Sequence, residues 1–164
     1  MTKSRSTSGS RVIAATAALI LSAAALSGCA QTTATTTGFV SQTELNALYQ
    51  QEVATFPWDL PTGVKFPSAV PVKDNGGLWE SNNARAKAYF YWQCAWVEEF
   101  FSVRESDPAT AALALDQLGV AAIDDEYLKP FLEDPERGWL RVLEKADLGD
   151  STDLKGYFDA SCTG

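Results

Sequence analysis

The stretch Tyr89–Phe101 (YFYWQCAWVEEFF) decides the fold that this sequence predicts. At helical spacing, its aromatic and aliphatic residues point in nearly every direction around the axis. A helix that is apolar on all sides has to be surrounded by other elements, and its aromatic side chains bury large areas in a core. We therefore expect a central helix that begins at Ser81 or Asn82 and runs to about Glu105, with Cys94 at its middle.

The helix before it is marked by a capping box. Ser41 and Glu44 have the spacing at which each side chain accepts a hydrogen bond from the other's backbone amide. Val40 and Leu45 occupy the positions of a hydrophobic staple, and Pro57 stops the helix. An apolar stripe at helical spacing is formed by Leu45, Leu48, Tyr49, Val53 and Phe56.

The segment from Pro57 to Gly77 connects these two helices and contains four prolines. Proline breaks helices and removes hydrogen-bond donors from strands, and Asn75-Gly76-Gly77 is a typical turn sequence. The segment is either a structural strap or an edge with polyproline character that binds a partner. In both cases we expect an extended arm that lays five apolar side chains across the helical core: Trp58, Leu60, Val64, Phe66 and Val70.

The next helix has clear start and stop signals. Asp107 is a good N-cap, and Pro108 suits the first helical position. We expect this helix to end at Gly119, where Val120 would contact Leu115 in a Schellman arrangement.

Three shorter helices are expected after it. An acidic helix spans Asp124 to about Lys129, and the next one begins at Asp134-Pro135 and ends at Gly149. Ser151 or Asp150 caps the last helix. Because no segment shows sustained alternation of apolar and polar residues, the sequence predicts an all-α fold. This fold is a single compact bundle of five to six helices around the central aromatic-rich helix, with the proline-rich arm.

The N-terminal segment has the features of an exported precursor. Lys3, Arg5 and Arg11 form a positively charged region without acidic residues. The apolar stretch Val12–Leu26 follows, which is about 15 residues long and too short to span a bilayer comfortably. Small residues and Cys29 come next.

The run Leu26-Ser27-Gly28-Cys29 resembles the lipobox of bacterial lipoproteins. The resemblance implies that residues 1–28 are a signal peptide, that cleavage occurs just before Cys29, and that the Cys29 thiol carries diacylglycerol. Two or more acyl chains, palmitate among them, give stable anchoring. The implied location is extracytoplasmic: the outer face of the cell membrane or, in a Gram-negative cell, the periplasm or outer membrane.

Cleavage at this point would leave one domain on a tether. Residues 29–40 are threonine-rich and form the tether, and residues 41–164 form the helical extracytoplasmic domain. The 10 basic and 21 acidic residues beyond the cleavage point give a formal charge of −11. Such a charge disfavours nucleic acid and bare anionic lipid as partners, so the lipid anchor has to hold the protein at the membrane.

Cys94 and Cys162 are the two cysteines that remain if Cys29 is acylated. An even number of cysteines outside the cytoplasm predicts a disulfide. This bond would join the middle of the central helix to the extreme C-terminus.

The sequence contains no histidine, which excludes histidine bases, histidine-containing triads and histidine zinc sites. The GxSxG, SxxK and phosphate-loop motifs are also absent. The acidic segment from Asp147 to Asp153 lacks the ligand spacing of a calcium loop and is typical of helix ends. We therefore expect neither a metal nor a cofactor.

Carboxylate chemistry remains open through Glu98 and Glu99 on the central helix. Adjacent helical residues point about 100° apart, so these two cannot form a close pair. At least one should face solvent or pair with a cation such as Arg85 or Arg104.

A candidate ligand cleft lies where the arm crosses the central helix, and its residues are Trp58, Trp79, Glu98 and Glu99. We expect Trp92 and Trp96 to lie in the core because they share one face of that helix. The predicted function is that of a lipid-anchored, non-enzymatic binding or accessory protein of the cell envelope, with a protein or a glycan as partner. One alternative is a glycosidase-like, carboxylate-based hydrolase of envelope polymers, and another is a structural or assembly subunit of a membrane complex.

Overall fold

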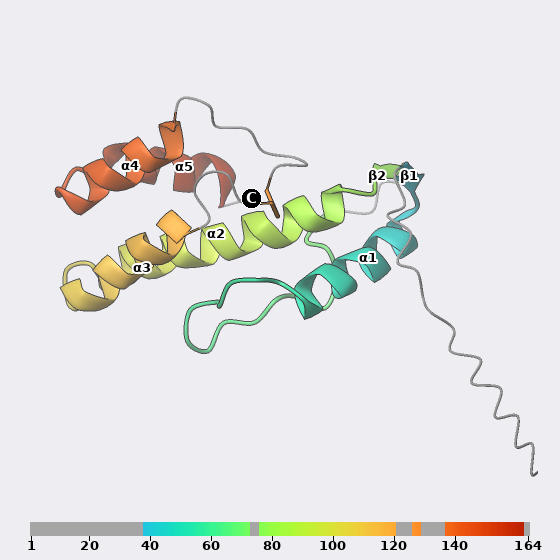
Figure 1. Ribbon diagram of the computed structural model, residues 1–164, viewed down its shortest axis with the longest axis horizontal. Helices are drawn as coiled ribbons and strands as arrows, with labels where there is room; N and C mark the ends of the chain where they lie inside the picture. The colour runs from blue at the N-terminus through green and yellow to red at the C-terminus, as the bar shows by residue number, and fades with distance from the viewer. Residues whose placement is uncertain (1–37, 73–75, 121–125, 129–136, 163–164) are drawn as a thin grey trace, which may run out of the picture. The chain divides into compact units, whose positions relative to one another are not determined.

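The computed structural model describes residues 38–72, 76–120, 126–128 and 137–162. The chain divides into two units, Met1–Ala34 and Thr35–Gly164, and all described residues belong to the second. Five helices and a two-stranded antiparallel ladder make up this described part (Figure 1). In chain order they are β1 (Phe39–Val40), α1 (Gln42–Ala54), β2 (Trp79–Glu80), α2 (Asn83–Val103), α3 (Pro108–Val120), α4 (Gly138–Asp147) and α5 (Thr152–Ser161).

The longest helix, α2, is the central element of the bundle. It contacts α1, α3 and α5, while α4 packs on α3 and α5 (Figure 1). Trp92 and Val97 are fully buried and Trp96 is nearly so. The prediction of a helical bundle around an aromatic-rich helix is therefore confirmed.

The capping box at the start of α1 is present as predicted. The Ser41 hydroxyl oxygen accepts a hydrogen bond from the Glu44 amide at 3.3 Å, and the Glu44 carboxylate accepts one from the Ser41 amide at 2.9 Å. Val40 and Leu45 lie in one buried apolar cluster. The helix ends at Ala54, before Pro57, since the residue that precedes a proline avoids helical geometry.

The proline-rich arm is held to the helices by polar contacts of its backbone. Residues 55–72, all of them described, form neither helix nor strand. The Lys65 carbonyl accepts a hydrogen bond from the Tyr91 hydroxyl at 2.9 Å, and the Val70 amide donates to the Asn46 side chain at 3.0 Å. The arm therefore bridges α1 and α2, as predicted.

Apolar side chains of the arm pack on the bundle with one exception. Trp58, Leu60 and Phe66 contact the larger core cluster around α2, and Val70 is buried in the smaller cluster beside α1. Val64 is exposed instead. The prediction for Val64 is wrong because that residue lies in a turn, where its amide bonds the Pro61 carbonyl.

The predicted end of α3 is also wrong. Asp107 caps this helix as expected, since its carboxylate accepts the Thr110 amide at 3.1 Å. However, the helix continues through Gly119 to Val120, so the Schellman arrangement does not form. A glycine inside a helix costs only about 1 kcal/mol, and burial of Leu115 and Leu118 against the core offsets that cost.

The C-terminal helices agree only partly with the expected boundaries. Residues 126–128 form a turn, and the rest of the predicted acidic helix lies outside the described residues, as do Asp134 and Pro135. Gly149 does end α4, with a φ of 95° that favours glycine. At the start of α5, the Asp150 carboxylate accepts the Thr152 amide at 3.2 Å.

The predicted disulfide joins Cys94 to Cys162, with the two Cα atoms 5.4 Å apart. It links the middle of α2 to the residue that follows α5. Disulfides of this kind are typical of proteins outside the cytoplasm.

Within the ranges that the structure describes, no helix is both long enough and apolar enough to cross a membrane.

Candidate functional site

The two tryptophans of the predicted cleft lie in different apolar clusters. Trp58 is half-buried among aromatic rings, with its ring centroid 5.1 Å from that of Trp92 and 5.4 Å from that of Tyr127. Trp79 lies in β2 and packs on the cluster that contains Val40. The structure therefore does not bring Trp58 and Trp79 together as one exposed pair.

The two acids of the predicted cleft lie far along α2 from β2. Glu98 is exposed and Glu99 is half-buried. At about 1.5 Å per helical residue, Glu98 lies roughly 22 Å along the axis from the first residue of α2. It is thus well separated from Trp79, and the four predicted residues do not form a single cleft.

The cations expected near these acids have other partners. The Arg85 Nε lies 3.2 Å from the Glu52 carboxylate, and the Arg104 Nε lies 3.4 Å from the Glu105 carboxylate. The prediction that at least one of Glu98 and Glu99 faces solvent or pairs with such a cation is met by the exposed Glu98. Arg85 is instead at the α1–α2 contact, and Arg104 follows the last residue of α2.

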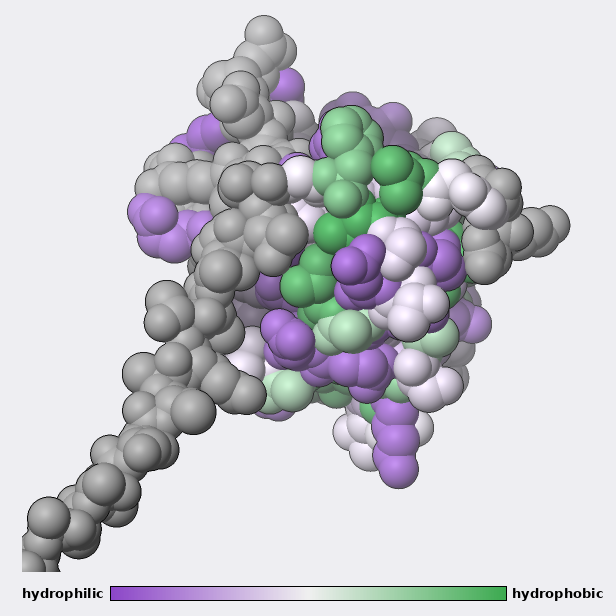
Figure 2. Space-filling view, turned by 90° about the vertical axis from the view of Figure 1, so that its right-hand side faces the viewer, coloured by the Kyte–Doolittle hydropathy of each residue, from purple (hydrophilic) through white to green (hydrophobic). Residues whose placement is uncertain are grey.

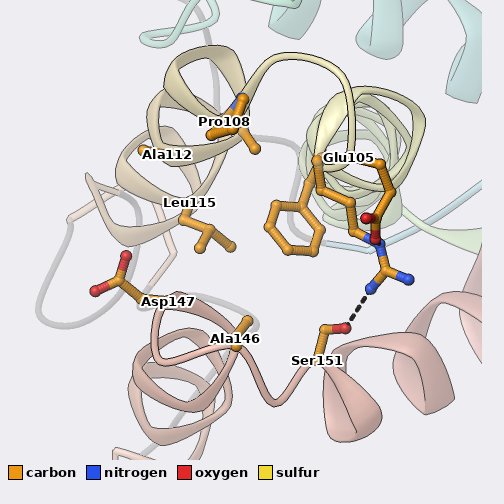
Figure 3. A pocket seen from close by; sticks show the side chains of 11 residues that line it. Glu105, Pro108, Ala112, Leu115, Ala146, Asp147 and Ser151 are labelled. Atoms are coloured by element: carbon orange, nitrogen blue, oxygen red, sulfur yellow. Dashed lines mark hydrogen bonds and ion pairs between the residues drawn. The ribbon is translucent and has the colours of Figure 1, made fainter.

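A pocket of about 250 Å³ lies where the C-terminal end of α2, the start of α3 and the α4–α5 connection meet (Figure 3). Its floor is apolar and buried, and it is formed by Phe100, Ala111, Leu115 and Ala146. Small side chains where α3 faces α4 leave the space open, because alanine fills less of the gap between packed helices than leucine does. This floor can accept an apolar group.

Charged and polar side chains form the rim of the pocket. Arg104 donates a hydrogen bond from Nη1 to the Ser151 hydroxyl at 2.6 Å, drawn as a dashed line in Figure 3. Its guanidinium also lies 5.2 Å from the centroid of the Phe101 ring. These contacts hold Arg104 at the mouth of the pocket, between α2 and the start of α5.

The rim carries more negative than positive charge. Glu105 is on the rim with a side chain that is 88% exposed, and Figure 3 shows the Asp147 carboxylate directed away from Leu115. Hydrogen bonds from Thr110 lower the pKa of Asp107, and hydrogen bonds from Thr152 lower the pKa of Asp150. Both carboxylates near this end of the molecule are therefore ionised at neutral pH.

A second titratable cluster joins α1 to α2. Glu52 and Arg85 form a partly buried ion pair, and the Arg85 guanidinium lies 4.9 Å from the centroid of the Tyr127 ring. Burial is the main cause that raises the pKa of Tyr127, and the neighbouring Glu52 charge adds to it. The cluster fixes α1 against α2, which is a structural role.

Among the residues that the structure describes, no group of three or more acidic or cysteine side chains is arranged to hold a metal ion. The pocket itself was missed by the sequence reasoning. One signal for it existed in the alanine-rich start of α3 (PATAALA), since small residues on a buried helix face leave space.

Comparisons with protein-family models, curated proteins and solved structures found no match for this chain.

Proposed function

We propose that this chain is a lipid-anchored, extracytoplasmic, non-enzymatic binding protein of the cell envelope, and that the pocket at the C-terminal end of α2 binds a partner protein. The lipobox-like run that ends at Cys29 supports the anchor. The Cys94–Cys162 disulfide supports an oxidising compartment. The pocket is the observation that supports the binding of a partner protein.

The character of the pocket favours an apolar side chain of a protein over a glycan. Small-molecule sites are usually about 300–1,000 Å³, whereas this pocket has about 250 Å³ and an apolar floor. Such a volume suits one large apolar side chain, and anchors of this kind dominate the energy of protein interfaces. Sugar rings need exposed aromatic faces, but Phe100 in the floor is largely buried.

The same geometry gives little support to the hydrolase alternative. A carboxylate hydrolase needs one acid that burial keeps protonated. Glu105, the rim carboxylate beside Arg104, has a side chain that is 88% exposed and already pairs with that cation. It therefore has the surroundings of an ordinary surface carboxylate.

The position of the pocket suits a protein that works away from the membrane. β1 comprises the last two residues of the predicted tether and pairs with β2, which lies just before α2 in the chain. The pocket is at the other end of α2, which at about 1.5 Å per residue is roughly 31 Å long. If Cys29 is anchored, the chain enters the domain at the β1 end of α2, and the pocket at the other end of α2 would be free for a partner in the envelope.

Filling the pocket tests the proposal. Ala112 is an exposed pocket residue on α3, so Ala112→Trp should place an indole in the pocket without disturbing the core. We expect this variant to co-purify at least tenfold less partner protein from detergent-solubilised envelopes. Ala47→Trp, at an exposed position of α1, is the matched control and should retain the partner. Equal recovery of the partner protein with both variants would show that the pocket does not bind it.

The anchor is tested separately. Mass spectrometry of the native protein should find diacylglycerol on an N-terminal Cys29, and Cys29→Ser should release the protein from membranes or leave the precursor uncleaved. A native protein with an intact leader and a free Cys29 thiol would refute the lipoprotein assignment.

A further inference from the structure

The ladder of β1 and β2 has one buried face and one exposed face. Phe39 pairs with Glu80 and Val40 pairs with Trp79. Because side chains alternate along a strand, Val40 and Trp79 point to one face, and both pack on the cluster beside α1. Phe39 and Glu80 point to the opposite face, and Leu78, the residue just before β2, is also exposed.

Phe39 and Leu78 are each 69% exposed. In an extended continuation of β2, Leu78 would lie diagonally across from Phe39 at about 7–8 Å, and we group these two side chains as one small apolar patch. We name it the outer ladder patch. Figure 2 looks onto the side of the molecule that carries the ladder, and apolar residues gather there between polar ones.

The patch lies directly beside the root of the proposed tether. Only nine peptide links separate Cys29 from Gly38, the first described residue. Fully extended, they reach about 32 Å at most, and a flexible chain of this length has an end-to-end distance of about 15–18 Å. An anchored Cys29 would therefore keep Gly38, the residue before Phe39, within about 32 Å of the lipidated residue.

We propose that the outer ladder patch rests on the lipid bilayer, with Phe39 and Leu78 inserted at the boundary between headgroups and acyl chains. Exposed apolar side chains next to an anchor gain burial there without further ordering of the chain. The proposal rests on the proposed lipid anchor. The bilayer should be zwitterionic, because Glu80 shares this face and the processed chain is acidic.

Lipid contact can be measured on the processed lipoprotein reconstituted into phosphatidylcholine vesicles. A phospholipid with a diazirine near the headgroup end of its acyl chain is activated by light, and labelled peptides are identified by mass spectrometry. We expect label on the peptides that contain Phe39 and Leu78. The double variant Phe39→Ser/Leu78→Ser should reduce this label at least fivefold.

Leu148 supplies the matched control, because it is 86% exposed but lies in the α4–α5 connection. Its peptide should remain unlabelled, and Leu148→Ser should leave the labelling of Phe39 and Leu78 unchanged. Equal label on Leu148, or a label that survives the double substitution, would overturn the proposal. If no lipid label appears and a separate protein cross-linking experiment joins two copies through Phe39, the proposal is overturned and the patch belongs to a dimer.

The same mass spectra separate this result from the state of the anchor. Vesicle-bound protein with diacylglycerol on Cys29 but no label at the patch refutes the membrane contact alone. Protein without the lipid on Cys29 refutes the anchor on which the contact rests.

Discussion

A buried amide beside the disulfide shows how one polar residue is tolerated in this core. Gln93 is only 4% exposed, and its side-chain oxygen accepts a hydrogen bond from the Tyr157 hydroxyl. A buried polar group is costly unless it is hydrogen-bonded. The contact therefore fixes the position of α5 on α2, next to Cys94.

Tyr157→Phe should destabilise the fold by about 1–3 kcal/mol, because it leaves the buried Gln93 oxygen without its donor. The variant should also change the response to alkali. Burial raises the pKa of Tyr157 to about 12 from an ordinary value of 10.0. The protonated phenol contributes its full stabilisation of the folded state below pH 10. This contribution is lost as the pH rises to about 12, because the unfolded chain releases the phenol proton at a lower pH than the folded chain does.

Urea titrations between pH 7 and 12 measure both effects. The midpoint should fall less steeply with pH for Tyr157→Phe than for the unchanged protein. Tyr91→Phe is the control, because the Tyr91 hydroxyl bonds the Lys65 carbonyl in an exposed position and should cost at most about 1 kcal/mol. Equal losses from the two substitutions would contradict the importance of the buried contact.

Helix boundaries depend on both local signals and packing, and α3 shows how the two compete. Asp107 and Pro108 start the helix through contacts within one turn, which a sequence pattern can predict. Gly119 looks like a stop signal, but the helix continues to Val120 because Leu115 and Leu118, in the turn before Gly119, are buried against the core. Packing of this kind cannot be read from neighbouring residues.

Gly119→Ala should therefore stabilise the protein by about 0.5–1 kcal/mol, because alanine loses less conformational freedom than glycine in a helix. Beyond its chain neighbours and its own helix backbone, a Cβ at Gly119 would meet no atom within 4 Å, so the change introduces no clash. Thermal unfolding of the variant gives the measurement.

Gly149→Ala is the contrasting substitution at a true helix end. Gly149 has a φ of 95°, a conformation that costs other residues about 1–2 kcal/mol. This variant should lower the melting temperature, whereas Gly119→Ala should raise it. A loss of stability at both positions would mean that Gly119 ends the helix after all.

Much of the bundle could be predicted from local patterns, whereas its assembly could not. The capping box at Ser41 and the all-round apolar character of α2 gave the start of α1 and the central helix. The Asp59 carbonyl, by contrast, accepts hydrogen bonds from the indoles of Trp92 and Trp96, which are 33 and 37 positions away. Such contacts depend on how the arm folds back, and no local pattern encodes them.

The candidate site illustrates the same limit. The predicted cleft grouped Trp58 and Trp79 because both flank the arm, yet the arm carries Trp58 into the aromatic cluster around Trp92. The pocket instead combines residues of α2, α3 and the α4–α5 connection. It exists only after these helices have packed, so composition and spacing give at most a hint of it.

The molecule as a whole is closed by the bond between Cys94 and Cys162, which are 68 positions apart. In the chain-entropy account, a loop of this length stabilises a fold by roughly 4 kcal/mol, because it restricts the unfolded chain. The same bond ties α5, and through it α4, to the middle of α2. Loss of the bond should thus weaken the C-terminal side of the bundle before it weakens the contact of α1 with α2.

Reduction of the protein with dithiothreitol should lower its unfolding free energy by roughly 4 kcal/mol, measured from urea midpoints. Hydrogen exchange should accelerate more in α5 than in α1, because α1 is held by the arm and by the ion pair of Glu52 with Arg85. The double variant Cys94→Ser/Cys162→Ser should match the reduced protein and should not respond to the reductant. Uniform acceleration in all helices would show that the bundle opens as one unit, and the bond would then stabilise both sides of α2 equally.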